Sequence, residues 1–238
     1  MNDAALIWSY LSQGPLMWLT ATLVAYLIGD ACFHLSGRRS WVNPVMIAVA
    51  VLGALLMATG TSYATYFEGA QFVHFMLGPA TVALGLPLFD NLRRVRRAAL
   101  PMIAALVSGS VTAVVSALLI GRMMGLPHEV LASLAPKSTT APVAIGVAEQ
   151  IGGQPTLTAV LVLLTGMIGA IVATPLLNLL RVRDWRARGF AVGVAAHGIG
   201  TARAFQVHQT AGAFSGIGMG LNAVLTAIIA PLMLRLFG

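Results

Sequence analysis

Long apolar segments with almost no charge constrain this chain more than any other feature. A helix needs about 20 apolar residues to cross the hydrocarbon core of a bilayer. Hydrophobic residues make up 58% of the chain and charged residues 9%, and the apolar runs are continuous, without the alternation of barrel strands. We therefore predict an all-α polytopic membrane protein that forms one integral membrane domain over residues 1–238. The predicted uninterrupted spans are 16–36, 43–59, 98–121, 156–180 and 212–236.

The positive charges predict how these segments are oriented. Arginines gather near residue 38, at 93–97 and at 181–188, which are the ends of apolar segments. Cytoplasmic loops carry an excess of Lys and Arg, so we expect these loops in the cytoplasm, the N-terminus outside and the C-terminus cytoplasmic. The net charge of +7 is spread over these ends, which does not favour a nucleic-acid partner. No basic region precedes the first apolar run, so we expect no cleavable signal peptide.

Three further segments are interrupted and cannot be straight helices. Residues 66–92 break at Gly78-Pro79, and residues 189–208 break between His197 and Gly200. Counted as crossings, these two bring the total to about seven spans. Residues 127–150 must enter and leave on the same face, as a re-entrant hairpin with Lys137 near its tip. The order of spans and breaks then predicts inverted repeats, about 16–125 and 126–238, as in secondary transporters.

Two isolated cations mark the interrupted segments. Lys137 is the only lysine of the chain and lies in PKSTTAP, and Arg203 lies in AHGIGTARA. A charged residue inside a membrane requires a partner or an aqueous cavity, so both cations are candidate anion ligands. The alternatives are a surface loop for Lys137 and a head group that reaches the interface for Arg203. The candidate substrate-binding residues are Lys137, Ser138, Thr139, Thr140, Gly78, Thr81, His197, Gly198, Thr201 and Arg203.

Other polar residues give weaker signals. Asp30 and His197 are candidates for proton coupling, although Asp30 could also pair with a nearby arginine and His197 could bond freed backbone groups. Hydroxyl side chains also serve helix packing. Cys32 is the only cysteine, which excludes an intrachain disulfide. The histidines show no ligand spacing, and no nucleotide loop or nucleophile–base pair occurs, so we expect no metal, no cofactor and no enzymatic activity.

Four ordered motifs carry a resemblance to a known family. They are FEGAQFVHFMLGPATVALGLPLF at 67–89, PKSTTAPVAIGVAEQIGG at 136–153, LTAVLVLLTGMIGA at 157–170 and AAHGIGTARA at 195–204. Together they resemble the LrgB/CidB family of bacterial membrane proteins, which is related to part of the plastid glycolate/glycerate transporter. The resemblance implies a bacterial cytoplasmic (inner) membrane location and a small partner membrane protein of the holin-like LrgA/CidA type. The two threonines at 139 and 140 depart from the expected motif, which leaves substrate choice open.

Two functions follow from the residues and the resemblance together. The isolated cations at the breaks favour transport of small organic carboxylates of the pyruvate, lactate or glycolate class, by alternating access. The alternative is an antiholin-like or holin-like modulator of murein hydrolase export and cell lysis. The sequence leaves open whether the chain works alone, as a homo-oligomer or only with its partner.

Overall fold

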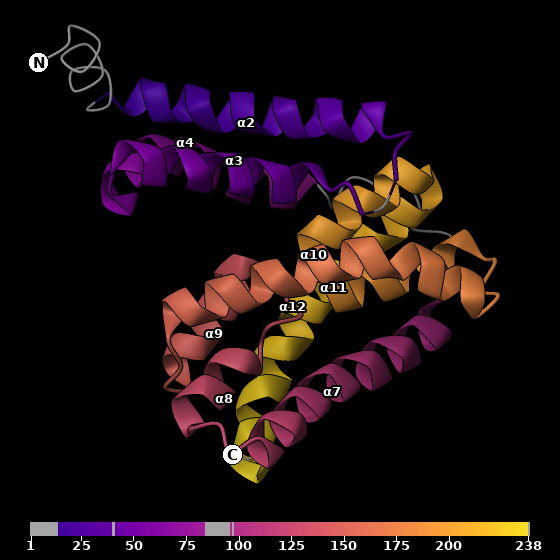
Figure 1. The fold of residues 1–238 in the computed structure, drawn as a ribbon. Coiled ribbons are helices and arrows are strands. Elements are labelled where there is room, and N and C mark those ends of the chain that lie inside the picture. The colour runs from indigo at the N-terminus through magenta and orange to yellow at the C-terminus, as the bar shows by residue number, and fades with distance from the viewer. Residues whose placement is uncertain (1–13, 40, 84–95, 97, 238) are drawn as a thin grey trace, which may run out of the picture. The chain divides into compact units, whose positions relative to one another are not determined.

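The computed structural model is entirely helical in the part of the chain that it describes, which is residues 14–39, 41–83, 96 and 98–237 (Figure 1). The chain divides into two compact units, residues 1–83 and 84–238. Each unit is described by itself. The predicted repeat boundaries stay a prediction, because residues 84–95 lie outside the described part.

The first unit contains three helices, α2 (Pro15–Leu35), α3 (Pro44–Thr59) and α4 (Tyr63–Ala83). Proline begins α2 and α3, where its missing N–H costs nothing. The Asn43 side chain accepts a hydrogen bond from the backbone N–H of Val45 at 2.8 Å and so caps α3. Trp18 is fully buried and packs edge-on against the ring of Tyr66, which joins α2 to α4.

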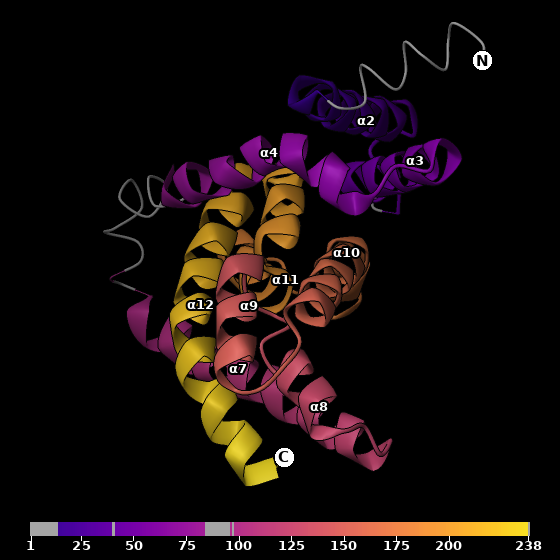
Figure 2. The same cartoon turned by 90° about the vertical axis from the view of Figure 1, so that its left-hand side faces the viewer.

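The second unit contains the remaining helices, which are drawn from magenta to yellow in Figures 1 and 2. They are α7 (Ala99–Met123), α8 (His128–Leu134), α9 (Ala141–Gln150), α10 (Pro155–Leu179), α11 (Trp185–Val207) and α12 (Gln209–Phe237). Helices α7 and α12 run in the same direction. Met102 and Leu106 of α7 pack with Phe214 and Ile217 near the start of α12, and Arg122 donates to the backbone carbonyl of Phe237 at 2.8 Å.

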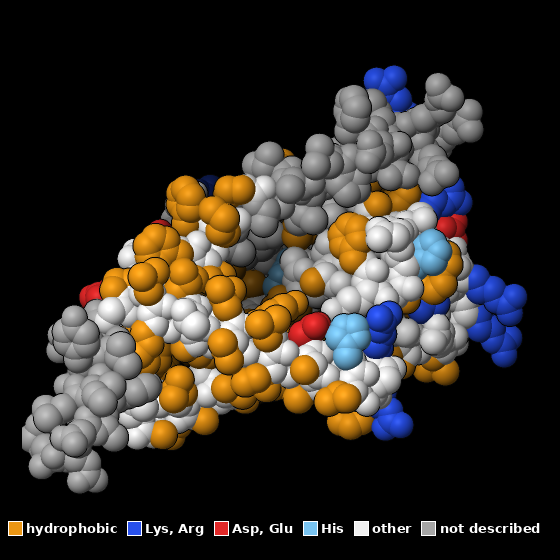
Figure 3. Space-filling model, turned by 90° about the horizontal axis from the view of Figure 1, so that it is seen from above, with side chains coloured by type: hydrophobic (Ala, Val, Ile, Leu, Met, Phe, Trp, Pro, Cys, Tyr) orange, Lys and Arg blue, Asp and Glu red, His pale blue; other side chains and the backbone are white. Residues whose placement is uncertain are grey.

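Among the described residues, α2, α7, α10 and α12 are long and apolar enough to cross a membrane. Large apolar side chains cover much of the described surface (Figure 3). On α10 they recur every four residues and so form one continuous stripe along the helix. The stripe consists of Val160, Leu164, Ile168, Val172 and Leu176. Such a stripe is what a lipid-facing helix presents, and the prediction of an all-α polytopic membrane protein is confirmed.

Helices α8 and α9 form the predicted re-entrant hairpin. Each is too short to cross a bilayer, and the turn between them contains Lys137. The backbone N–H of Gln154, just after α9, donates to the Ser133 hydroxyl of α8 at 2.7 Å. This bond holds the exit of the hairpin beside the last turn of α8, so α9 leads the chain back from the tip at Lys137.

Helix α11 is also a hairpin, and this corrects the predicted topology. The backbone is non-helical at Ala196 and at His197, which has a φ of 40°. The Trp185 and His208 rings at its two ends stack with centroids 4.8 Å apart. Each half is only about 15 Å long, half the thickness of a hydrocarbon core. The prediction that residues 189–208 cross the membrane is therefore wrong.

Because α11 is a hairpin, α12 ends on the side opposite to the one predicted. Because α11 returns to its starting side, α12 begins at the end of the unit that holds Asp184, where α10 meets α11. It then runs to Phe237, beside Arg122 at the opposite end. The span count from sequence placed the C-terminus on the same side as the basic loop at 181–188. In the structure these two segments lie at opposite ends of the second unit.

Glycine permits the close packing that holds α11 against α12. A Cβ atom on Gly189 or Gly193 would overlap the backbone carbonyl oxygens of Ala211 or Ser215, respectively. The backbones of the two helices are therefore in direct contact, as small residues allow in membrane proteins. This contact keeps the first half of α11 alongside the start of α12 and aims its broken end at the centre of the unit.

Candidate functional site

The two hairpins enter from opposite ends and their tips meet at Asn222, midway along α12. The two N–H groups of its side-chain amide donate to the backbone carbonyls of Ser138 and Val194, each at 3.1 Å. Ser138 belongs to the tip of the α8–α9 hairpin, and Val194 precedes the break in α11. One side chain therefore ties both tips to α12.

The acceptor side of the same amide is also occupied. The Ser110 hydroxyl of α7 donates to Asn222 Oδ1 at 2.6 Å, and the Thr226 hydroxyl donates to it at 3.2 Å. Asn222 is 1% exposed, so these bonds replace the hydrogen bonds to water that the amide loses when it is buried. The hydrogen bonds of Asn222 join α7, α12 and both tips at one point.

His197 is held at the α11 break by bonds to protein. Its Nε2 lies 2.9 Å from the Val162 carbonyl of α10, and since a carbonyl only accepts, Nε2 carries a proton. A Cβ atom on Gly166 would lie 2.6 Å from the ring, so glycine makes room for it. Thr201 donates to the His197 carbonyl at 2.7 Å, and the Ser215 hydroxyl therefore donates to Thr201 at 2.9 Å.

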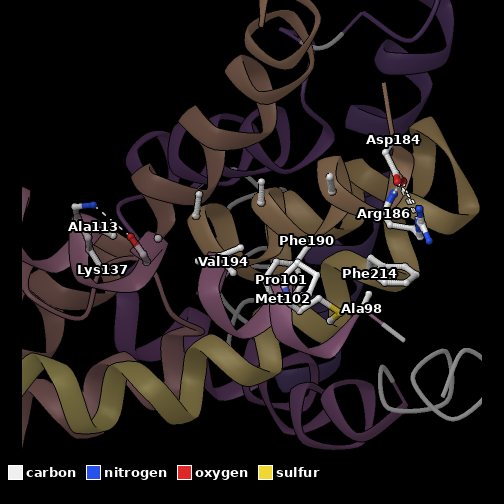
Figure 4. A pocket seen from close by; sticks show the side chains of 16 residues that line it. Ala98, Pro101, Met102, Ala113, Lys137, Asp184, Arg186, Phe190, Val194 and Phe214 are labelled. Carbon is white, nitrogen blue, oxygen red and sulfur yellow. Dashed lines mark hydrogen bonds and ion pairs between the residues drawn. The ribbon is translucent and has the colours of Figure 1, made fainter. Parts of the chain in front are cut away.

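A cavity of about 700 Å³ runs from the α8–α9 tip to the start of α11 (Figure 4). Lys137 and Ser138 form its inner end, and Asp184 and Arg186 form its outer end. The walls between them are apolar and come from α7, the first half of α11 and the start of α12. These wall residues are Ala98, Pro101, Met102, Ala105, Gly109, Ala113, Ala187, Phe190, Ala191, Val194, Ala195 and Phe214.

The two ends of the cavity differ in charge. At the outer end, Arg186 pairs with Asp184 at 2.6 Å, and its side-chain hydrogen bonds hold the pKa of the Asp184 carboxyl below its usual value. At the inner end, Lys137 Nζ donates to the Ser138 hydroxyl at 3.3 Å. The described residues form ion pairs between Asp184 and Arg186 and between Asp30 and His34, and Lys137 belongs to neither. Among the described residues no carboxylate compensates the charge of Lys137, which is therefore available to an anion.

Two further residues of the hairpin tip were candidates from sequence. Thr139 is completely buried, and its hydroxyl has no hydrogen-bond partner among the residues that the structure describes. Thr140 is the N-cap residue of α9 without a side-chain capping bond. The start of α9, with the positive end of its dipole, therefore lies at the same tip as Lys137.

The other candidates lie apart from this cavity. Arg203 lines a separate small pocket with Arg188 and Trp185, near the ends of α11. Asp30 belongs to the first unit, where its carboxylate lies 3.6 Å from the His34 ring, an ion pair when the histidine is protonated. Gly198 follows the α11 break directly. Gly78 and Thr81 lie in α4, which is helical through Pro79, so the predicted break at Gly78-Pro79 is wrong. The surroundings of these two residues lie outside the described part of the structure.

Sequence reasoning missed the residues that join the two tips. Asn222 and Ser110 were not singled out, although an amide in the middle of a long apolar span is a signal in itself. Asp184 and Arg186 were taken only as part of a basic loop. Their place at the cavity mouth depends on how α7 packs against α11, which the sequence does not reveal.

The LrgB-like family profile matches residues 22–236. The chain belongs to the LrgB-like family. YwbG of Bacillus subtilis, named an uncharacterized protein, is 35% identical over 91% of this chain and 96% of its own length. Proteins named holin-like protein CidB from Staphylococcus epidermidis (strain ATCC 35984) and Staphylococcus aureus (strain Mu50) are each 32% identical. These matches cover 82% and 83% of this chain, respectively, and 86% of each relative. No solved structure matches the chain.

Proposed function

We propose that this protein carries small organic carboxylates of the pyruvate, lactate and glycolate class across the membrane. The observation that supports the proposal most directly is Lys137 at the inner end of the cavity, without a carboxylate partner among the described residues. A lysine within the membrane requires a counter-charge, and a carboxylate substrate would supply it. The Ser138 hydroxyl, which lines the same end, would donate to the second carboxylate oxygen.

The arrangement of the two hairpins also favours a carrier. Transporters place substrates near the bilayer midplane, where helix ends from the two leaflets meet. Here the α8–α9 tip and the α11 break meet at Asn222, and the cavity extends from Lys137 at this tip to Arg186. Thr139, Thr140 and the N-terminus of α9 would provide further donors, while His197 and Thr201 would support the opposite tip. Gly78, Thr81, Gly198, Arg203 and Asp30 stay proposed site or proton-coupling residues.

The proposed setting is a bacterial cytoplasmic membrane, with the loop at Arg181–Arg188 in the cytoplasm and the N-terminus outside. In this orientation the cavity opens to the cytoplasm and α12 ends outside. The family relationship supports a small holin-like partner of the LrgA/CidA type, and a homo-oligomer is compatible with the exposed apolar helices.

A second candidate function rests on the names of the relatives. Two of them are named holin-like protein CidB, which supports a role in holin-like control of murein hydrolase export and cell lysis. In that function the cavity would have no substrate. Substitution of Lys137 would then change lysis phenotypes without any measurable carboxylate uptake.

The deciding experiment is uptake of labelled pyruvate, lactate and glycolate into proteoliposomes. The carrier proposal predicts saturable uptake that is lost in Lys137→Ala. The matched control is Arg183→Ala, which removes an exposed cation of the basic loop that does not line the cavity. Equal uptake by the two variants would overturn the role of Lys137. Absence of uptake by the unaltered protein, together with a lysis phenotype in cells, would favour the holin-like function.

A further inference from the structure

The cavity that ends at Lys137 is much larger and more apolar than a two- or three-carbon acid requires. Ligand pockets of about 300–1,000 Å³ bury most of a drug-sized molecule, and this one measures about 700 Å³. Its polar groups lie at its two ends. Between them the walls are aliphatic and aromatic, with Met102, Phe190 and Phe214 as the largest side chains (Figure 4).

The charges limit the ligand to one negative group. Arg186 is neutralised by Asp184 at the mouth, so its charge is not available to a second carboxylate. At the inner end, Lys137 is the one charged residue among the described residues that line the cavity. A dicarboxylate bound at Lys137 would bury its second charge between apolar walls, which is costly without a partner.

Small residues on facing helices make the space for an apolar chain. Ala105 of α7 and Ala191 of α11 both line the middle of the cavity and are exposed to it. Larger side chains at these positions would fill the space between the two helices. Alanine here leaves a slot that runs from the mouth towards Lys137, with room for methylene groups.

Building on the proposed carrier function, we propose that the preferred substrates are monocarboxylates with an unbranched saturated chain. The carboxylate binds Lys137 and Ser138, and the chain extends along the apolar walls towards Arg186. Hydroxylated short acids bind the same inner end but leave the walls uncovered. The specificity of the site therefore comes from chain burial, and the charge sets the orientation.

The test is competition against labelled pyruvate uptake in proteoliposomes, with a series from acetate through butanoate and hexanoate to octanoate. Burial of each methylene should strengthen inhibition about four-fold, the equivalent of about 0.8 kcal/mol, until the chain fills the cavity. Succinate should inhibit poorly. Hexylamine partitions into lipid but carries the opposite charge, so it should not inhibit as hexanoate does.

Two variants distinguish binding in the cavity from general effects of the acids on the lipid bilayer. Ala105→Leu fills the middle of the cavity and should reduce the advantage of octanoate over acetate. Ala104→Leu makes the same change at the next position, which is exposed but does not line the cavity, and should leave the advantage intact. Inhibition that does not rise with chain length, in a protein that transports pyruvate, would overturn the substrate class and leave the carrier function standing. A protein that neither transports nor binds any monocarboxylate would overturn both.

Discussion

We predict that removal of the Asn222 side-chain amide strongly destabilises the second unit. Replacement by Leu keeps a side chain of similar size but removes every hydrogen bond of the amide. It leaves two carbonyls, those of Ser138 and Val194, without the bonds that Asn222 donates. It also leaves the hydroxyls of Ser110 and Thr226 without their acceptor. All four groups then lie in a buried region that water reaches poorly.

The magnitude follows from the number of groups left without partners. A buried polar group that loses its partner costs about 1–3 kcal/mol in soluble proteins, and hydrogen bonds between membrane helices average about 0.6 kcal/mol. Four such groups, at about 0.6–1.3 kcal/mol each, give an expected loss of about 2–5 kcal/mol for Asn222→Leu. Thr226→Val removes one bond to the same amide oxygen and leaves the tips attached, so it should cost about 0.5–1 kcal/mol.

The assay is reversible unfolding of the purified protein in mixed micelles, followed by tryptophan fluorescence. Trp185 reports on the second unit, because its stack on His208 holds the two ends of α11 together. A double-mutant cycle of Ser110→Ala with Asn222→Leu isolates the bond between α7 and α12. If Asn222→Leu destabilises the protein no more than Thr226→Val does, the two tips are not held by this amide and the reasoning is refuted.

Two further predictions concern the same unit. Gly193→Ala should destabilise it by about 1–3 kcal/mol in the same unfolding assay, because the added methyl group overlaps the Ser215 carbonyl. In the control Gly220→Ala the methyl group meets nothing within 4 Å, so this variant should be neutral or stabilising. Equal effects of the two substitutions would contradict the close packing of α11 and α12. Asp184→Asn should free the positive charge of Arg186. Succinate should then inhibit pyruvate uptake at least several-fold more strongly, relative to acetate, than in the unaltered protein. An unchanged ratio of succinate to acetate inhibition would show that the charge of Arg186 does not act on the ligand.

The spans and one of the two hairpins could be predicted from the sequence. Apolar runs at 98–121, 156–180 and 212–236 correspond to α7, α10 and α12, with ends that differ by at most three residues. The α8–α9 hairpin was predicted because residues 127–150 are interrupted and because the arginine-rich loops orient the flanking spans so that both of its ends lie on one face. Hydropathy and charge position are read directly from the sequence, without knowledge of what each segment packs against.

The path of α11 could not be predicted in the same way. A break near His197 is compatible with a kinked crossing or with a hairpin, and only contacts between distant residues distinguish them. The deciding contacts are the stack of Trp185 on His208 and the bond between Thr201 and Ser215. The same error concerns Arg203, which was expected beside Lys137 but lies in the returning half of the hairpin, near its base.

The second unit is open on one side of the Asn222 crossing and filled on the other. The cavity extends from the crossing to Arg186. Beyond the crossing, α8 and α9 occupy the corresponding space and pack in an apolar cluster with α7 and α12. The buried members of this cluster are Val114, Leu118, Leu131, Ala132, Ala135, Val147, Ile229, Ala230 and Leu234.

For the proposed carrier, this asymmetry points to the bond that would have to break in the transport cycle. To open the filled side, the α8–α9 hairpin must move away from α12, and its tip is held there by the bond from Asn222 to the Ser138 carbonyl. The bond to Val194 holds the other tip and need not change in the same step. A carboxylate that draws Lys137 and the Ser138 hydroxyl towards the cavity pulls on the hairpin beside the first bond. Binding of the substrate at the Ser138 hydroxyl and release of the Ser138 carbonyl from Asn222 would then be linked within one residue.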